Sequence, residues 1–199
     1  MNSISDTYRS IAAPAKGIYK ELGSKFLAFA HPVETEEEAK NIIAALRKEY
    51  FDARHHCFAW RLGLTGEPYR FSDDGEPSST AGRPIHGQLL SQELSDILVV
   101  VVRYFGGVKL GVPGLIRAYR TATQDALANA SVIEKVAGQV FTVQFGYLQM
   151  NDVMKVLKEM GLTPLRQDFD LDFRLEVRVR LGQIEEFQKQ LAFCQINLK

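Results

Sequence analysis

Four basic residues and no acidic one lie between positions 97 and 124, and a glycine-rich stretch runs among them. Glycine lets a backbone turn sharply or approach a ligand closely, and the free N–H groups at the start of a helix favour an anion. A glycine loop that leads into a helix can therefore bind a phosphate group. Alternatively, the glycines only let the loop pack against its own sheet. The residues concerned are Arg103, Lys109, Arg117 and Arg120, with Gly106, Gly107, Gly111 and Gly114.

The known nucleotide-binding motifs do not account for this loop. The spacing from Gly106 to Gly111 is that of a Walker loop, but Val112 and Pro113 stand where Lys and Ser or Thr are required. The stretch also contains no G-x-G-x-x-G. The nucleotide-binding motifs therefore do not decide between a phosphate contact and packing of the loop against its own sheet.

A second stretch, residues 73–82, places three acids beside three hydroxyl side chains in a loop rich in Gly and Pro. Carboxylates in such a loop can bind a divalent cation or act as an acid-base pair, although their spacing is not that of an EF-hand. Asx turns and a helix cap explain the same residue types equally well. Both interpretations stay open. The acids are Asp73, Asp74 and Glu76, and Thr80 is the last of the hydroxyl residues.

The positions of the histidines and cysteines indicate core packing rather than a metal site or a catalytic pair. His55 and His56 lie in a predicted strand at residues 52–62, so their side chains point to opposite faces and make a poor metal site. Cys57 shares a face with His55, but no third group is present to orient the pair as a nucleophile and base. Cys57 is expected in the core, and Cys194 has no partner at C-x-x-C spacing.

The elements that must position these residues can be read from hydrophobic periodicity. Residues 97–102 are apolar and mostly β-branched, which predicts a strand buried on both faces, followed by the glycine loop and a helix. Upstream we expect a hairpin of two strands, 17–22 and 25–31, that turns at Gly23-Ser24. After it we expect a helix that begins with a capping box at Thr35 and Glu38 and ends near Tyr50. A strand at 69–72 and a helix at 85–94 surround the acidic loop.

The last third of the chain has its own pattern. We expect strand 140–147, helix 150–160, strands 163–169 and 173–181, helix 184–192 and strand 194–198, an order that gives a ferredoxin-like sandwich. Arg174, Arg178 and Arg180 would lie on its open face. Aromatic residues for base stacking are missing there, which argues against an RNA-recognition-motif mechanism. Phosphate contact and a solvated surface are the remaining interpretations.

Length and composition exclude several classes of protein. The 199 residues suit one large or two small domains, and 24 basic against 24 acidic residues exclude a globally basic nucleic-acid binder. Two cysteines are too few for a disulfide framework. No signal peptide or membrane-spanning run is present, so we expect a cytoplasmic protein with no membrane partner. The predicted domains are residues 1–135 and 137–199.

Three motifs resemble the Impact family, in particular its bacterial YigZ-like members: VVRYFGGVKLGVPGLIRAY, DARHHCFAW and FSDDGEPSSTAGRPI. Ser24, Lys25 and Phe26 also match a Ser-basic-Phe pattern of the family. Pro113 departs from it, because a small residue, commonly Gly, is expected there. The resemblance implies an α+β chain with an N-terminal α/β domain similar to the second domain of ribosomal protein S-five. The C-terminal domain would be similar to the last domain of elongation factor G.

Eukaryotic Impact proteins are known as translation regulators, and both ribosomal relatives touch RNA. We expect this chain to lack the eukaryotic N-terminal partner-binding module. The resemblance therefore implies a translation-linked regulator that contacts RNA or the ribosome through the N-terminal cleft. The alternatives are an enzyme acting on a phosphorylated or nucleotide substrate and a protein-protein regulator.

The sequence predicts no catalytic residue, metal or cofactor, and it does not indicate an oligomeric state. The candidate phosphate or nucleic-acid contacts are Lys25, Arg54, His55, Arg103, Tyr104, Gly106, Gly107, Lys109, Gly111, Gly114 and Arg117. The candidate loop-shaping or acid-base residues are Asp73, Asp74, Glu76 and Thr80.

Overall fold

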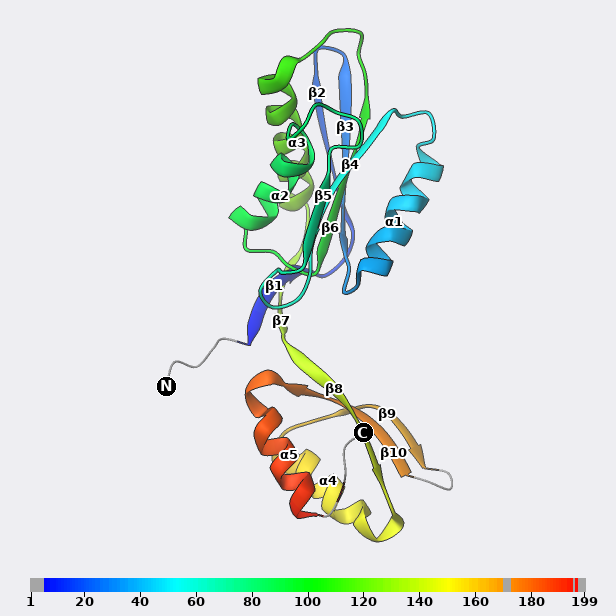
Figure 1. Ribbon diagram of the computed structural model, residues 1–199, viewed down its shortest axis with the longest axis vertical. Coiled ribbons are helices and arrows are strands. Elements are labelled where there is room, and N and C mark those ends of the chain that lie inside the picture. Colours follow the sequence, from blue (N-terminus) through cyan, green and yellow to red (C-terminus); the bar gives the residue numbers. More distant parts are fainter. Residues whose placement is uncertain (1–5, 170–172, 195, 197–199) are drawn as a thin grey trace. The chain divides into compact units, whose positions relative to one another are not determined.

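The computed structural model describes residues 6–169, 173–194 and 196. The chain divides into two compact units, one formed by Tyr8–Lys135 and the other by Val136–Lys199 together with Met1–Thr7. Each unit has its own sheet and its own helices (Figure 1). Whether residues 1–135 and 137–199 fold independently stays a prediction.

The N-terminal unit is built on a five-stranded antiparallel sheet in the order β2-β3-β6-β4-β5. Its strands are β2 Ala15–Glu21, β3 Ser24–Pro32, β4 His55–Arg61, β5 Tyr69–Ser72 and β6 Ile97–Tyr104. β6 lies at the centre, and all six residues from 97 to 102 are 0% exposed. The predicted strand buried on both faces is therefore confirmed.

Helices cover both faces of this sheet (Figure 1). Helix α1 (Glu36–Glu49) covers one face, while α2 (Gly82–Ser91) and α3 (Gly111–Ala128) cover the other. Because successive strand side chains point to opposite faces, the sheet has two cores. Trp60 and Leu98 belong to the core under α1, and Ala59 and Val101 to the core under α2 and α3.

Two local predictions were displaced by a few residues. The β2–β3 turn is centred on Leu22 and Gly23, whose φ angles are 46° and 78°, and not on Gly23-Ser24. Ser24 instead begins β3 and is fully buried. The second helix begins at Gly82, three positions before the predicted start, for a reason that lies in the acidic loop.

A small sheet of β1 (Thr7–Ile11) and β7 (Val132–Val136) was not predicted. The predicted domain boundary, between residues 135 and 137, falls at the end of β7. Val132 and Ile133 are more than a third exposed, so β7 lacks the alternation of a half-buried strand. Backbone pairing with the distant β1 forms this strand, and the local pattern does not show it.

The C-terminal unit contains a three-stranded antiparallel sheet in the order β8-β10-β9, with helices on one face (Figure 1). Its elements are β8 Gly138–Phe145, a 3₁₀ turn at Tyr147–Gln149, α4 Met150–Glu159, β9 Pro164–Phe169, β10 Phe173–Arg180, a 3₁₀ turn at Leu181–Gln183 and α5 Ile184–Phe193. The arrangement is ferredoxin-like, and the chain is an α+β protein. The predicted last strand, 194–198, lies largely outside the described residues.

Candidate functional site

The acidic loop begins with Asp73, whose carboxylate accepts three backbone hydrogen bonds. The N–H groups of Ser79, Ala81 and Gly82 donate to it at 2.8, 3.0 and 2.9 Å. Gly82 is the first residue of α2, and the N-cap residue Ala81 makes no side-chain cap bond. Asp73 therefore caps α2 from outside the helix. Its negative charge also interacts favourably with the helix dipole at this end.

Asp74 attaches the loop to the opposite side of the sheet. One carboxylate oxygen accepts a hydrogen bond from the backbone N–H of His56 at 2.7 Å, and the other accepts from Nη2 of Arg47 at 2.6 Å. The backbone oxygen of Asp74 lies 2.9 Å from Nδ1 of His55. The carboxylate of Asp74 is therefore held by Arg47 on α1.

Glu76 points into the N-terminal unit. Its side chain is 3% exposed, and Oε1 accepts hydrogen bonds from Nη1 of Arg103 at 2.6 Å and from the Tyr119 hydroxyl at 2.8 Å. The guanidinium of Arg103 also lies 5.4 Å from the ring centre of Phe26. Arg103 is itself only 6% exposed, so we correct its predicted role: it is a buried partner of Glu76 and does not present its charge at the surface.

A thiol and a phenol extend this buried cluster. The Cys57 thiol donates to the backbone oxygen of Asp73 at 3.0 Å and lies 3.3 Å from the Tyr119 hydroxyl. Burial raises the pKa of the Cys57 thiol and of the Tyr119 hydroxyl well above their usual ranges. Cys57 is therefore a protonated core residue, because a thiol must lose its proton to act as a nucleophile.

The glycine loop packs against the β2–β3 turn. A Cβ at Gly106 would lie 1.9 Å from the carbonyl carbon of Gly23, and the N–H of Gly106 donates to the Ser24 hydroxyl at 3.1 Å. Gly107 adopts a φ of 89°, which disfavours any residue with a side chain. The packing explanation for the glycines thus applies directly to Gly106.

The remaining loop glycines lie at the start of α3. Gly111, its first residue, has a φ of 68°, whereas a Cβ at Gly114 would lie 3.0 Å from the Cβ of Leu110. Gly111 therefore serves the turn into the helix, and Gly114 serves close packing within its first turn.

Tyr104, at the end of β6, makes a surface contact. Its hydroxyl donates to the Asp52 carboxylate at 2.7 Å, and this bond together with partial desolvation raises the pKa of Tyr104 to about 12. Tyr104 therefore remains a neutral donor near neutral pH.

Strand register places several predicted residues at one end of the sheet. Lys25 lies opposite Tyr104, and His55 lies opposite Arg103. Lys25, Arg54, Lys109 and Arg117 are exposed. Arg117 forms an ion pair with Glu21. No ion pair involves the other three within the described part of the chain.

A groove lies between the acidic loop, α2 and α3, with a cavity volume of 560 Å³. Arg83 and Arg120 line it, and no acidic residue does. Of the residues singled out from the sequence, Thr80 and Arg120 line the groove, and the Thr80 hydroxyl donates to the backbone oxygen of Pro77 at 2.7 Å. Arg83 was missed, although its position directly after the acidic loop was an available signal. The lining residues are Ser78, Ser79, Thr80, Arg83, Pro84, His86, Gly87, Gln88, Leu90, Val112, Ile116 and Arg120.

No group of three or more His, Cys, Asp and Glu side chains is arranged to hold a metal ion within the described ranges. No helix among those described is long and apolar enough to span a membrane.

Comparison with known proteins places these features in a family. The model of the Impact N-terminal domain matches residues 22–127, a range that contains both loops and the groove. The chain belongs to the Impact family. The IMPACT family member YigZ of Escherichia coli (strain K12) is 33% identical over 183 residues, which cover 91% of this chain and 90% of that relative.

Other Impact relatives differ in how much of the chain they match. The protein IMPACT homolog of Saccharomyces cerevisiae is 30% identical over 112 residues, covering 54% of this chain and 43% of the yeast protein. A crystal structure of a hypothetical protein is 31% identical with a TM-score of 0.75, and the match covers 98% of this chain and 97% of that one. The bacterial relative and the crystal structure therefore extend over both units.

Proposed function

We propose that this chain is a cytoplasmic, translation-linked regulator that contacts RNA or the ribosome through the basic cleft of its N-terminal unit. Membership of the Impact family supports the regulatory role, because the resemblance to this family implies a translation-linked regulator. We use the name basic cleft for the exposed Lys25, Arg54 and Lys109 near the glycine loop together with the groove lined by Arg83 and Arg120.

The distribution of charge is the observation that carries the proposal. The three acids of the loop are all engaged within the protein: Asp73 by backbone N–H groups, Asp74 by Arg47, and Glu76 by Arg103. The neighbouring cations Lys25, Arg54 and Lys109 are exposed, as are Arg83 and Arg120 in the groove. None of these five cations forms an ion pair within the described part of the chain, so their positive charge is available to attract phosphates in a chain of zero net charge.

The same contacts disfavour the enzyme alternative. A general base or metal ligand needs a carboxylate that can reach the substrate or the ion. Each carboxylate of the acidic loop instead accepts hydrogen bonds from protein groups, and Glu76 is nearly inaccessible. No described contact favours the enzyme over the regulator.

Fluorescence anisotropy with a labelled single-stranded RNA, measured across a series of salt concentrations, tests the RNA contact. We expect affinity to fall with salt, and Lys25→Gln and Lys109→Gln each to lower the slope of log affinity against log salt by about 0.7. Lys48→Gln is the matched control, because Lys48 is an exposed lysine in the last turn of α1 that belongs neither to the glycine loop nor to the lining of the groove. Equal slopes for wild type and all three variants would remove the RNA contact from the proposal.

A further inference from the structure

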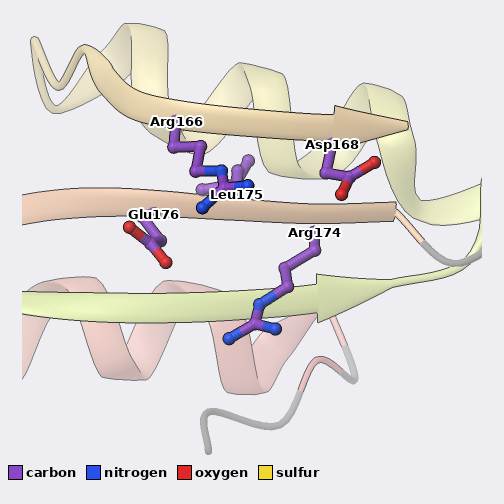
Figure 2. A pocket seen from close by; sticks show the side chains of 5 residues that line it. All are labelled: Arg166, Asp168, Arg174, Leu175 and Glu176. Atoms are coloured by element: carbon purple, nitrogen blue, oxygen red, sulfur yellow. The ribbon is translucent and has the colours of Figure 1, made fainter. Parts of the chain in front are cut away.

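The open face of the C-terminal sheet carries charges of both signs, and most of them lie opposite a complementary charge. On β10, Arg174 lies opposite Asp168 of β9, and Glu176 lies opposite Arg166. Figure 2 shows these four side chains on the face of the sheet away from the helices. Opposite charges on neighbouring strands neutralise one another locally, so this part of the face has little net charge to offer a ligand.

Arg178 and Arg180 continue the same strand face without such partners. Their neighbours on β8 are Val140 and Gly138, neither of which is charged. The register between β10 and β9 shifts after Glu176, and the pairing ends where Val177 pairs with Pro164, the first residue of β9. Both arginines are exposed, and within the described part of the chain neither makes an ion pair.

A pocket with a cavity volume of 430 Å³ lies beside these two arginines, entirely within the C-terminal unit. Its lining contains no acidic residue, and besides the arginines it offers the Thr163 hydroxyl and the Gln183 side-chain amide as hydrogen-bond donors. The lining residues are Val136, Ala137, Gly138, Met160, Gly161, Leu162, Thr163, Arg178, Arg180 and Gln183.

The backbone around the pocket is compatible with a bound anion. A Cβ at Gly138 would lie 3.1 Å from Cγ of Arg178, so the glycine leaves room for the arginine stem beside it. The nearby C-terminus of α4 carries partial negative charge, which would repel an anion. Its last carbonyls are already occupied, because Met160 donates to Val156 at 3.0 Å and Leu162 donates to Leu157 at 2.8 Å.

We infer that Arg178 and Arg180, with Thr163 and Gln183, form a binding site for a phosphate group in the C-terminal unit. Residues two apart on a strand face are separated by about 6.6 Å, so two long guanidinium side chains can reach different oxygens of one phosphate. The inference goes beyond the proposed function, because it uses the other unit and shares no residue with the basic cleft. Each of the two can therefore fail alone.

Two-dimensional ¹H–¹⁵N NMR of the full chain, titrated with inorganic phosphate at constant ionic strength, tests the site. We expect saturable shifts at Gly138, Gly161 and Thr163 and at the side-chain amide of Gln183. Arg178→Gln combined with Arg180→Gln should weaken phosphate binding by at least tenfold. Thr163→Val, which removes one donor and no charge, should weaken it by a smaller factor.

Arg174→Gln is the matched control, since Arg174 lies on the same strand and the same face but opposite Asp168. Binding by this variant should stay within twofold of wild type. Shifts that do not saturate, or an Arg178/Arg180 double variant that keeps the wild-type spectrum and binds phosphate as wild type does, would overturn the inference. If the double variant does not fold, Thr163→Val decides, and unchanged binding by it counts against the site.

Two further probes identify where the phosphate comes from. A short single-stranded RNA that shifts the same resonances more tightly than inorganic phosphate indicates a nucleic-acid backbone. A phosphomonoester such as phosphoserine that shifts them while the RNA does not indicates a small phosphorylated molecule. Both results support the site, and failure of both probes together with inorganic phosphate refutes it.

Discussion

The carboxylate of Glu76 joins the acidic loop to β6 and α3, because its Oε1 accepts hydrogen bonds from Arg103 on β6 and from Tyr119 on α3. Both side chains of the ion pair are less than a tenth exposed, so water cannot replace either partner. Removing one member of such a pair leaves the other charge buried and uncompensated. Glu76 is therefore the residue on which the conformation of the acidic loop depends most.

Glu76→Gln should lower the free energy of unfolding by about 3 kcal/mol, since it leaves the Arg103 charge buried without its counter-ion. Urea unfolding followed by circular dichroism measures the change. Lys40→Gln is the control, because both side chains of the ion pair between Lys40 and Glu36 are about half exposed and the pair should contribute little. Equal stability of Glu76→Gln and wild type would contradict the assignment of a buried, structural pair.

His86 provides a test that depends on pH. It is 8% exposed and stacks on Tyr69 with ring centres 4.6 Å apart, and burial followed by the charge of Arg61 lowers its pKa. A lowered folded-state pKa gives stability that is present above the unfolded value of about 6.5 and is lost as pH falls through the folded-state pKa. His86→Phe keeps an aromatic ring in the stack but cannot titrate.

The melting temperature of wild type should therefore fall as pH is lowered from about 7.5 to about 5.5, and the fall should be smaller for His86→Phe. Burial also lowers the pKa of His31 and His56, so part of the dependence should remain in the variant. Identical pH profiles for the two proteins would show that His86 does not contribute.

At the scale of elements, sequence patterns predicted those features that depend on residues close together in the chain. The apolar run of β6 and the Thr35 cap of α1 are local, and both are present as predicted. The start of α2 was misplaced because its cap comes from Asp73, nine positions before Gly82. The contact of Asp74 with Arg47 spans 27 positions and could not be read from spacing.

The glycine loop allows a comparison of two adjacent positions. Gly106→Ala should destabilise the N-terminal unit strongly, because the new Cβ would overlap the backbone of Gly23 and separate the loop from the β2–β3 turn. Gly107→Ala should cost only about 1–2 kcal/mol, from its positive φ alone, since nothing lies within 4 Å of its Cβ. Chemical denaturation of both variants tests this order, and a larger loss for Gly107→Ala would contradict the packing described for Gly106.

At the scale of the whole molecule, the two units have separate cores. We propose that residues 1–135 and 137–199 fold independently, and limited proteolysis with a protease of low specificity tests this. The first cuts should fall near the boundary between Lys135 and Val136 and release a stable N-terminal fragment. First cuts within β8 to β10 that leave no stable N-terminal fragment would show that the boundary is elsewhere.

Co-sedimentation with ribosomes across a salt series tests the proposed function most directly. The full chain should sediment with ribosomes at low salt and be released as salt rises, because phosphate contacts release counterions. A variant with Lys25, Arg54, Lys109 and Arg120 all changed to Gln should stay in the supernatant at low salt, whereas Lys48→Gln should sediment like wild type. Co-sedimentation of the fourfold variant and the wild type to the same extent at every salt concentration would contradict the proposal.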